Sequence, residues 1–144
     1  MNIEKRSKLR VLLVDDENDI LDLYASILAS GDTGIANDGG TSEKARGGFF
    51  NTRELLPDFE YFDVDRCNQG NEAIDAVKKS LSDKSPYAMT FLDIRMPPGP
   101  DGLETAVELR RLDPQLNIII ITGYPEMPPL DIARLIPPLG RLVF

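Results

Sequence analysis

Three short apolar runs in this chain each stop abruptly on side chains that carry oxygen atoms. The runs are Arg10–Val14 followed by Asp15 and Asp16, Ala88–Leu92 followed by Asp93, and Asn117–Ile121 followed by Thr122. Runs this short and this rich in branched residues are typical of strands buried on both faces of a parallel sheet. Because the carboxyl ends of such strands form the crevice where ligands collect, we expect the three ends to lie together. An edge rich in carboxylate oxygen suits a hard divalent cation and a phosphoryl group.

The segments between and around these runs predict the remaining elements of an alternating α/β fold. Helices are expected from Asn18 or Asp19 to about Ser30, after a cap at Asn68 through Leu81, over Leu103–Leu112 and, for two turns, over Leu130–Ile136; further strands are expected over Phe59–Cys67 and from Arg141 to Phe144. Helical spacing of apolar residues or clear start and stop signals support these helices. The alternation predicts a doubly wound five-stranded parallel sheet in the order 2-1-3-4-5, with the last helix missing.

The segment 31–57 interrupts this alternation. It is rich in Gly, Thr, Ser, Asn and charged residues, with apolar anchors only at Phe49–Phe50 and Leu55–Leu56. A connection of this length far exceeds the usual loop between a helix and a strand. We therefore expect an insertion, in which Phe49–Leu56 could form a short helix that holds it to the domain. The pattern leaves open whether the insertion is functional or incidental.

Composition narrows the range of functions. At 144 residues the chain has the length of one domain, so residues 1–144 are expected to form a single unit. Its formal net charge of -8 argues against direct binding to nucleic acid or to an anionic membrane surface. The chain contains no histidine, which leaves carboxylates to carry any chemistry. A single cysteine, Cys67, a charged start at Met1–Lys8 and the lack of a long apolar run together predict a cytoplasmic location.

The polar ends of the three runs carry a family resemblance when they are taken together. In chain order, the motifs Val14-Asp15-Asp16-Glu17, Leu92-Asp93-Ile94-Arg95-Met96-Pro97 and Ile121-Thr122-Gly123 resemble those of the receiver domain of two-component response regulators. The resemblance covers Leu9 to Phe144 apart from the insertion. The loop Met96–Gly102 is one residue longer than the commonest receiver loop, and the chain resembles N-terminal receivers with an insertion after helix one.

The resemblance implies a role for each of a few residues. Asp93 would be the phosphoacceptor, and Thr122 would donate its hydroxyl to the acquired phosphoryl group and act as the switch. Asp16 and Asp93 would ligate Mg²⁺ directly, Asp15 would act mainly through a bound water, and the backbone carbonyl of Arg95 would complete the set. A histidine kinase would supply the phosphoryl group, and an output module, fused or separate, would respond to the switch. A divalent cation suits this chemistry because it neutralises negative charge on the phosphoryl oxygens.

The end of the sequence departs from the family pattern. Receivers carry a lysine just after strand five, whereas this chain ends at Phe144, in or just after that strand. Arg141 lies too early in the sequence to replace the lysine. We expect either a truncated receiver or one that is weakened as a switch. Loss of the last helix would expose apolar side chains of strands three to five, so self-association is a further expectation.

Each motif also has a simpler interpretation. Asp15 and Asp16 could serve only to cap the helix that follows them, and Asp93 could serve only to begin a turn. Arg95 and Tyr124 occupy positions that tune dephosphorylation in receivers, yet as loop residues they could be inert.

Other classes of protein fit the motifs less well. A phosphatase with an aspartyl nucleophile usually has a second acid two residues after the first, where this chain has Arg95. A nucleotide-binding fold lacks support because no G-x-G-x-x-G follows the first strand and no P-loop is present. We therefore expect a signalling domain rather than an enzyme, with a phosphorylation-independent interaction module of the same fold as the alternative.

Overall fold

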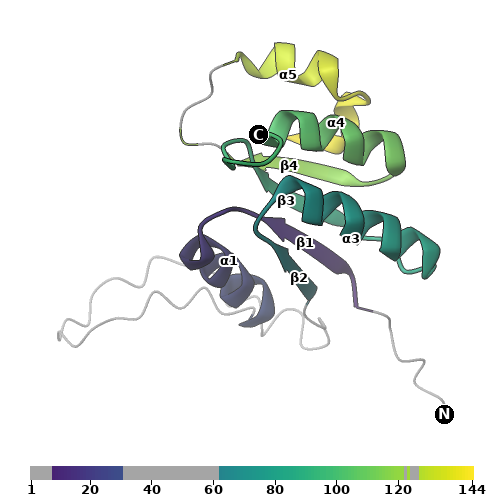
Figure 1. The fold of residues 1–144 in the computed structure, drawn as a ribbon. Coiled ribbons are helices and arrows are strands. Elements are labelled where there is room, and N and C mark those ends of the chain that lie inside the picture. Colours follow the sequence, from purple (N-terminus) through teal and green to yellow (C-terminus); the bar gives the residue numbers. More distant parts are fainter. Residues whose placement is uncertain (1–7, 31–61, 122, 124–126) are drawn as a thin grey trace, which may run out of the picture.

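Helices and strands alternate along the chain (Figure 1). The computed structural model describes residues 8–30, 62–121, 123 and 127–144, so the expected insertion and its short helix lie outside the described residues. The elements are β1 (Arg10–Val14), α1 (Asn18–Ser30), β2 (Asp63–Cys67), α3 (Gly70–Ser82), β3 (Met89–Asp93), α4 (Gly102–Leu112), β4 (Asn117–Ile121), α5 (Pro129–Leu135), a 3₁₀ turn (Leu139–Arg141) and β5 (Leu142–Val143). Within the described ranges, no helix is long and apolar enough to cross a membrane.

The strands form one parallel sheet in the order β2-β1-β3-β4-β5. This order confirms the predicted doubly wound fold. The register pairs Val14 of β1 with Leu92 of β3, and Asp93 with Ile121 of β4. β1, β3 and β4 therefore finish at nearly the same level of the sheet.

Several element boundaries differ from those predicted. β2 begins at Asp63 rather than Phe59, and β5 is only two residues long because the preceding residues form a 3₁₀ turn. The expectation that Asn68 caps the second helix is wrong, because Gln69 occupies the N-cap position of α3. The backbone N–H of Asn68 instead donates to the Glu72 carboxylate at 2.7 Å, and its side chain turns toward another loop.

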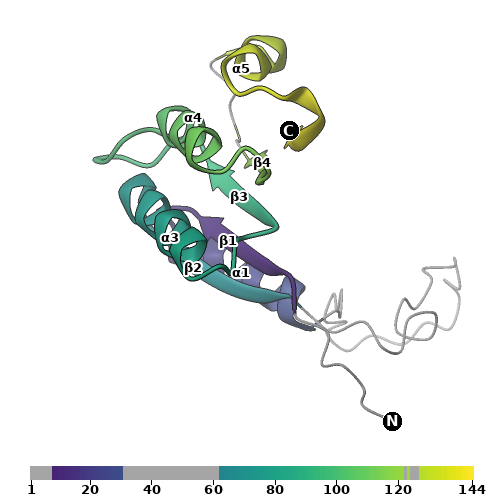
Figure 2. The same cartoon turned by 90° about the vertical axis from the view of Figure 1, so that its right-hand side faces the viewer.

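The helices cover the two faces of the sheet unequally. α1 lies on one face, and α3 and α4 lie on the other (Figures 1 and 2). Alternate residues of each strand point to opposite faces, so Leu12 belongs to the core beneath α3 and α4, while Val11 and Leu13 pack with Leu21 of α1. Apolar residues of α5, Ile132 among them, join the first of these two cores. The larger core therefore lies on the α3 and α4 side.

The α1 side of the sheet is incompletely covered over β3, β4 and β5. Phe91 and Ile119 are only half-buried there, and Val143 is 54% exposed. The Tyr24 ring of α1 stacks on the Phe91 ring, with 6.1 Å between the centroids. Among the described residues, α1 is the only helix that packs on this face, and it contacts mainly β1 and β2. This arrangement agrees with the expected absence of a last helix from the described fold.

A polar cluster joins β1, β2 and the segment before β3 at the amino ends of the strands. Arg10 Nη2 donates to Asp65 Oδ2 at 2.5 Å, and the Tyr87 hydroxyl donates to the same oxygen at 2.6 Å. The Arg10 guanidinium also lies 4.3 Å from the centre of the Tyr87 ring. Burial raises the pKa of Asp65, but the hydrogen bonds from Tyr87 and Arg10 outweigh it, and the net shift is downward. The cluster thus fixes the strands that carry the acids at the opposite edge.

Tyr87→Phe tests this cluster. It removes a donor to a charged oxygen, so we expect the free energy of unfolding at pH 7 to fall by roughly 1.5 kcal/mol. Because the pKa of Asp65 is lowered in the folded state, the ionised carboxylate stabilises the fold above its unfolded pKa of about 3.9. That contribution is lost as the pH falls through the folded pKa, so the effect of the substitution should shrink in acid.

Urea denaturation of parent and variant at pH 7 and at acidic pH measures the effect. Tyr24→Phe is a matched control, since it removes a hydroxyl from a ring that stacks on Phe91, away from the cluster. An equal loss for Tyr87→Phe at every pH would contradict the proposed bond to ionised Asp65.

Candidate metal centre

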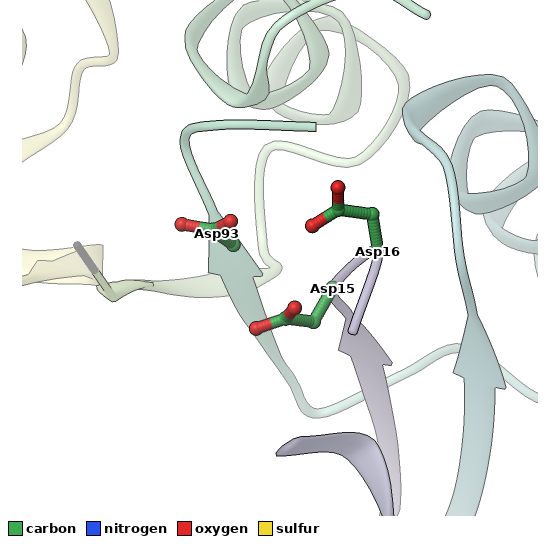
Figure 3. Close-up of side chains that lie close together, drawn as sticks. All are labelled: Asp15, Asp16 and Asp93. Atoms are coloured by element: carbon green, nitrogen blue, oxygen red, sulfur yellow. The ribbon is translucent and has the colours of Figure 1, made fainter. Parts of the chain in front are cut away.

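Three aspartates come together at the carboxyl edge of the sheet. Asp15 and Asp16 directly follow β1, and Asp93 is the last residue of the neighbouring strand β3 (Figure 3). One carboxylate oxygen from each of the three lies within 4.8 Å of the others. Asp15 and Asp93 are half-buried. The structure therefore brings together the three acids that the sequence placed at strand ends.

The donor set fits a hard divalent cation. Mg²⁺ binds oxygen at about 2.0–2.1 Å, so oxygen ligands on opposite sides of the ion are about 4 Å apart. One carboxylate oxygen from each of the three aspartates lies within 4.8 Å of the other two, a separation that small side-chain rotations or an intervening water would accommodate. Carboxylates with room for several waters are the ligands that Mg²⁺ prefers in proteins. The residues present thus fit the ion that the family resemblance implies.

Arg95 and Thr122, the other two residues of the predicted site, are not part of the carboxylate cluster. Arg95 is exposed and lies two residues after Asp93, in the loop at the same edge of the sheet. Its backbone N–H bonds to the Asp93 carboxylate. Thr122 lies outside the described residues, although Ile121 before it is level with Asp93.

Burial and charge act together on Asp93. Burial is the main cause that raises the pKa of Asp93, and the nearby carboxylates of Asp15 and Asp16 raise it further. The backbone N–H groups of Arg95 and Ile94 bond to the carboxylate and partly offset this rise. The ionised form of Asp93 therefore costs the folded protein free energy when no cation is bound.

The pKa of Asp15 is also raised, for similar reasons. Burial is again the first cause of its raised pKa, and Asp16 adds to it, whereas a 2.9 Å hydrogen bond from the Glu17 N–H lowers it. Asp15 and Asp93 lie at a hollow whose other walls are mostly apolar. These walls are Leu13, Val14, Leu21, Tyr24, Phe91 and Ile121. Removal of water by these side chains explains why the two carboxylates are harder to ionise.

The loop that follows Asp93 is closed by the start of α4. The Gly102 N–H donates to the Ile94 carbonyl at 2.7 Å, and a Cβ at this position would lie 2.0 Å from the Asp93 carbonyl oxygen. Only glycine allows so close an approach. Asp101 caps α4 by accepting from the Glu104 N–H at 2.8 Å. The helix start therefore fixes the backbone on which the Asp93 carboxylate is mounted.

Sequence reasoning missed the polar contacts that link the acid-bearing loops. Asn68 and Gln69 follow β2, and their side chains reach the loops after β1 and after β3. The only signal in the sequence was an Asn-Gln-Gly step after a strand, and it was taken for a helix cap. A local sequence pattern does not reveal hydrogen bonds between residues that are far apart along the chain.

Comparison with known families identifies the class of protein. A family model described as the response regulator receiver domain matches residues 49–133, which is more than half of the chain. The chain therefore belongs to the response regulator receiver domain family, which confirms the resemblance seen in the sequence. The matched range includes Asp93 but not Asp15 or Asp16. Among curated proteins, none matches this chain.

Solved structures share the fold. One is a complex of CheX and CheY with BeF₃ and magnesium from Borrelia burgdorferi, with a TM-score of 0.63 and 19% identity over 99% of this chain and 82% of that one. A receiver protein from Sinorhizobium medicae has a TM-score of 0.62 and 22% identity over 95% and 80% of the two chains. The response regulator TrrA from Thermotoga maritima, in complex with Mg²⁺ and BeF, has a TM-score of 0.54 and 26% identity over 94% and 84%.

Asp93→Asn should stabilise the metal-free protein at neutral pH. The raised pKa means that the folded state favours protonated Asp93, and this stabilising effect, present below the unfolded pKa, is lost as the pH rises through the folded pKa. An uncharged amide avoids the cost of the ionised carboxylate. We expect the melting temperature in EDTA at pH 7 to rise by a few degrees, and the gain to shrink in acid.

Thermal unfolding monitored by circular dichroism checks this prediction. Asp75→Asn, at an exposed position of α3, is the matched control and should change little. Added Mg²⁺ should stabilise the parent more than Asp93→Asn, because ligand binding to the folded state raises its stability. A variant less stable than the parent at pH 7 in EDTA would contradict the electrostatic argument.

Proposed function

We propose that this receiver domain accepts a phosphoryl group on Asp93 from a histidine kinase, with Mg²⁺ as cofactor, and that Thr122 acts as the switch. The observation that carries the proposal is the cluster of Asp15, Asp16 and Asp93 at the carboxyl edge of a receiver sheet, where one oxygen from each lies within 4.8 Å of the others. The chain contains no histidine, and the carboxylate cluster supports a carboxylate as the acceptor.

Asp93 is the nucleophile in this proposal. One of its carboxylate oxygens attacks the phosphorus, the bond from phosphorus to the donor imidazole breaks, and the leaving imidazole takes up a proton. The product is an acyl phosphate, which hydrolyses readily because it is a mixed anhydride. The backbone N–H groups of Ile94 and Arg95 orient the carboxylate for this attack.

The other residues hold the ion and respond to the phosphoryl group. Asp16 and Asp93 would ligate Mg²⁺ directly, Asp15 mainly through a water, and the backbone carbonyl of Arg95 would complete the protein's share. When bound, the ion neutralises the negative charge that gathers on the phosphoryl oxygens. The Thr122 hydroxyl would donate to one of these oxygens, and its movement would change the surface that a partner contacts.

The proposal also concerns partners and location. The partners are a histidine kinase and an output module, fused or separate, and the domain acts as a signalling module rather than an enzyme. A structure in which a CheY protein is bound to CheX supports a role for this fold in protein contacts. The net charge of -8 supports a role without nucleic-acid or membrane binding. The single cysteine and the charged start at Met1–Lys8 support the proposal that this role is in the cytoplasm.

Phosphorylation with a small-molecule donor tests the function directly. We expect acetyl phosphate with Mg²⁺ to add one phosphoryl group at Asp93, seen by intact mass and peptide mapping, and Asp93→Asn to abolish it. Asp16→Asn should weaken Mg²⁺ binding by more than about tenfold, since it removes an anionic ligand from a site with few, and Asp15→Asn should weaken it less.

Asp75→Asn again provides a control of equal chemistry at an exposed position on α3. Added mass on Asp15, on Asp16 or on a hydroxyl residue would refute the assignment of Asp93. Unchanged Mg²⁺ affinity in Asp93→Asn would refute the metal geometry. A parent that binds Mg²⁺ but takes up no phosphoryl group would favour the alternative, a phosphorylation-independent interaction module.

The half-exposed apolar face favours self-association as a second property. Ile119 and Val143 lie on the face that α1 leaves open, and Val143 is 54% exposed. An apolar surface of this kind tends to contact another chain. We expect the sedimentation coefficient to rise with concentration and Val143→Lys to reduce the rise. Leu130→Lys, at a 71% exposed residue of α5, is the control, and a parent that stays monomeric at high concentration would disprove self-association.

A further inference from the structure

Two consecutive amide side chains lie between the loops that carry the acids. Asn68 and Gln69 follow β2, next to the strand whose end carries Asp15. Asn68 Nδ2 donates to Asn18 Oδ1 at 2.7 Å and to the backbone carbonyl of Asp15 at 3.4 Å. Asn68 therefore contacts both the first acid of the site and the first residue of α1.

Gln69 makes the corresponding contacts with the loop after β3. Its Nε2 donates to the Pro97 carbonyl at 3.4 Å, and its Oε1 accepts from the Gly99 N–H at 3.3 Å. A Cβ on Gly99 would lie 2.5 Å from Gln69 Oε1. Glycine at position 99 thus leaves the space that the Gln69 amide occupies.

The base of this link is itself fixed. The Asn68 N–H donates to the Glu72 carboxylate at 2.7 Å, and the Asp15 N–H donates to the Cys67 carbonyl at 3.1 Å. Gly70 then packs so closely on α4 that a Cβ there would lie 2.0 Å from Thr105 Oγ1. The two amides therefore project from a backbone that is held on both sides.

The amides do not serve the helix that they precede. Gln69 occupies the N-cap position of α3, yet its side chain makes no capping hydrogen bond. The Gln69 amide bonds instead to the loop after β3, which indicates a role outside the helix.

We propose that Asn68 and Gln69 form an amide clasp that holds the two acid-bearing loops at the separation that suits a divalent cation. The carboxylates of Asp15, Asp16 and Asp93 repel one another when no cation is present, and the repulsion tends to move the loop after β1 away from β3. The clasp opposes this movement, so less reorganisation is needed when the ion binds. Asn68 and Gln69 are positioning residues, and their role rests on the proposed function of the site.

The clasp predicts a specific pattern of Mg²⁺ affinities. Asn68→Ala and Gln69→Ala should each weaken Mg²⁺ binding by about fivefold, the effect expected for one lost hydrogen bond. The double variant should bind Mg²⁺ about as tightly as the single variant with the larger loss of affinity. The reason is that a link between two loops fails when either of its two amides is lost. Isothermal titration calorimetry of the whole chain provides the dissociation constants.

Gly99→Ala is an independent test of the contact between the Gln69 amide and the loop after β3. The new Cβ would displace the Gln69 amide without removing it, so Mg²⁺ binding should weaken in the parent but not further in the Gln69→Ala background. Asn71→Ala and Gln115→Ala remove amides of the same kinds at exposed positions and serve as matched controls.

Hydrogen exchange without metal separates the clasp from the proposed function. Asn68→Ala should speed exchange in residues 15–18, and Gln69→Ala should speed it at the Met96 and Gly99 N–H groups, which are the only backbone amides of the proline-rich segment 96–100. The controls should leave both segments protected as in the parent. A parent that binds no Mg²⁺ would overturn the proposed function and, with it, the metal-positioning role.

Three results would overturn the clasp while leaving the proposed function standing. They are parent-like Mg²⁺ affinity in both alanine variants, additive losses in the double variant, and unchanged exchange in both loops. The expected results are non-additive losses of affinity together with faster exchange in the loop that each amide contacts.

Discussion

The partial burial of neighbouring carboxylates, together with their mutual repulsion, is the constraint that the rest of the fold has to satisfy. Two of these carboxylates are half-buried beside apolar side chains, where charges interact more strongly than in water. The pKa of Asp15 and of Asp93 is raised, chiefly by burial, so the ionised site opposes folding when no cation is bound. A functional site of this kind persists only because other contacts hold its parts in place.

Some of those contacts lie at the opposite edge of the sheet. Arg10, Asp65 and Tyr87 bind one another at the amino ends of β1 and β2. Next to β5, Arg110 donates to the Leu116 carbonyl at 2.6 Å and to the Arg141 carbonyl at 2.9 Å. Cations paired with acceptors stabilise the amino edge, whereas the site at the carboxyl edge gathers acids. These stabilising interactions therefore lie at the opposite edge of the sheet from the carboxylates of the candidate metal centre.

The sequence predicted the parts of this arrangement that depend on local patterns. Asp93 could be placed at the end of a strand because the residues before it are apolar and a proline-rich loop follows, and the register then brings it beside Asp15. The extent of β5 could not be predicted, because a 3₁₀ turn replaces the strand up to Arg141. The bond between Asp65 and Tyr87 joins residues 22 positions apart, and no periodicity encodes such a pair.

The hollow beside the acids connects the site with the incompletely covered face of the sheet. Phe91 and Ile121 line the hollow next to Asp15 and Asp93, and the same two side chains belong to the face that α1 leaves half-exposed. Burial is the main cause of the raised pKa of Asp93, so any group that covers these side chains would make its ionised form more costly. A bound cation would offset that cost by pairing with the carboxylate. Coverage of the face and cation binding are therefore linked through the charge of Asp93, because each changes how favourable the other is.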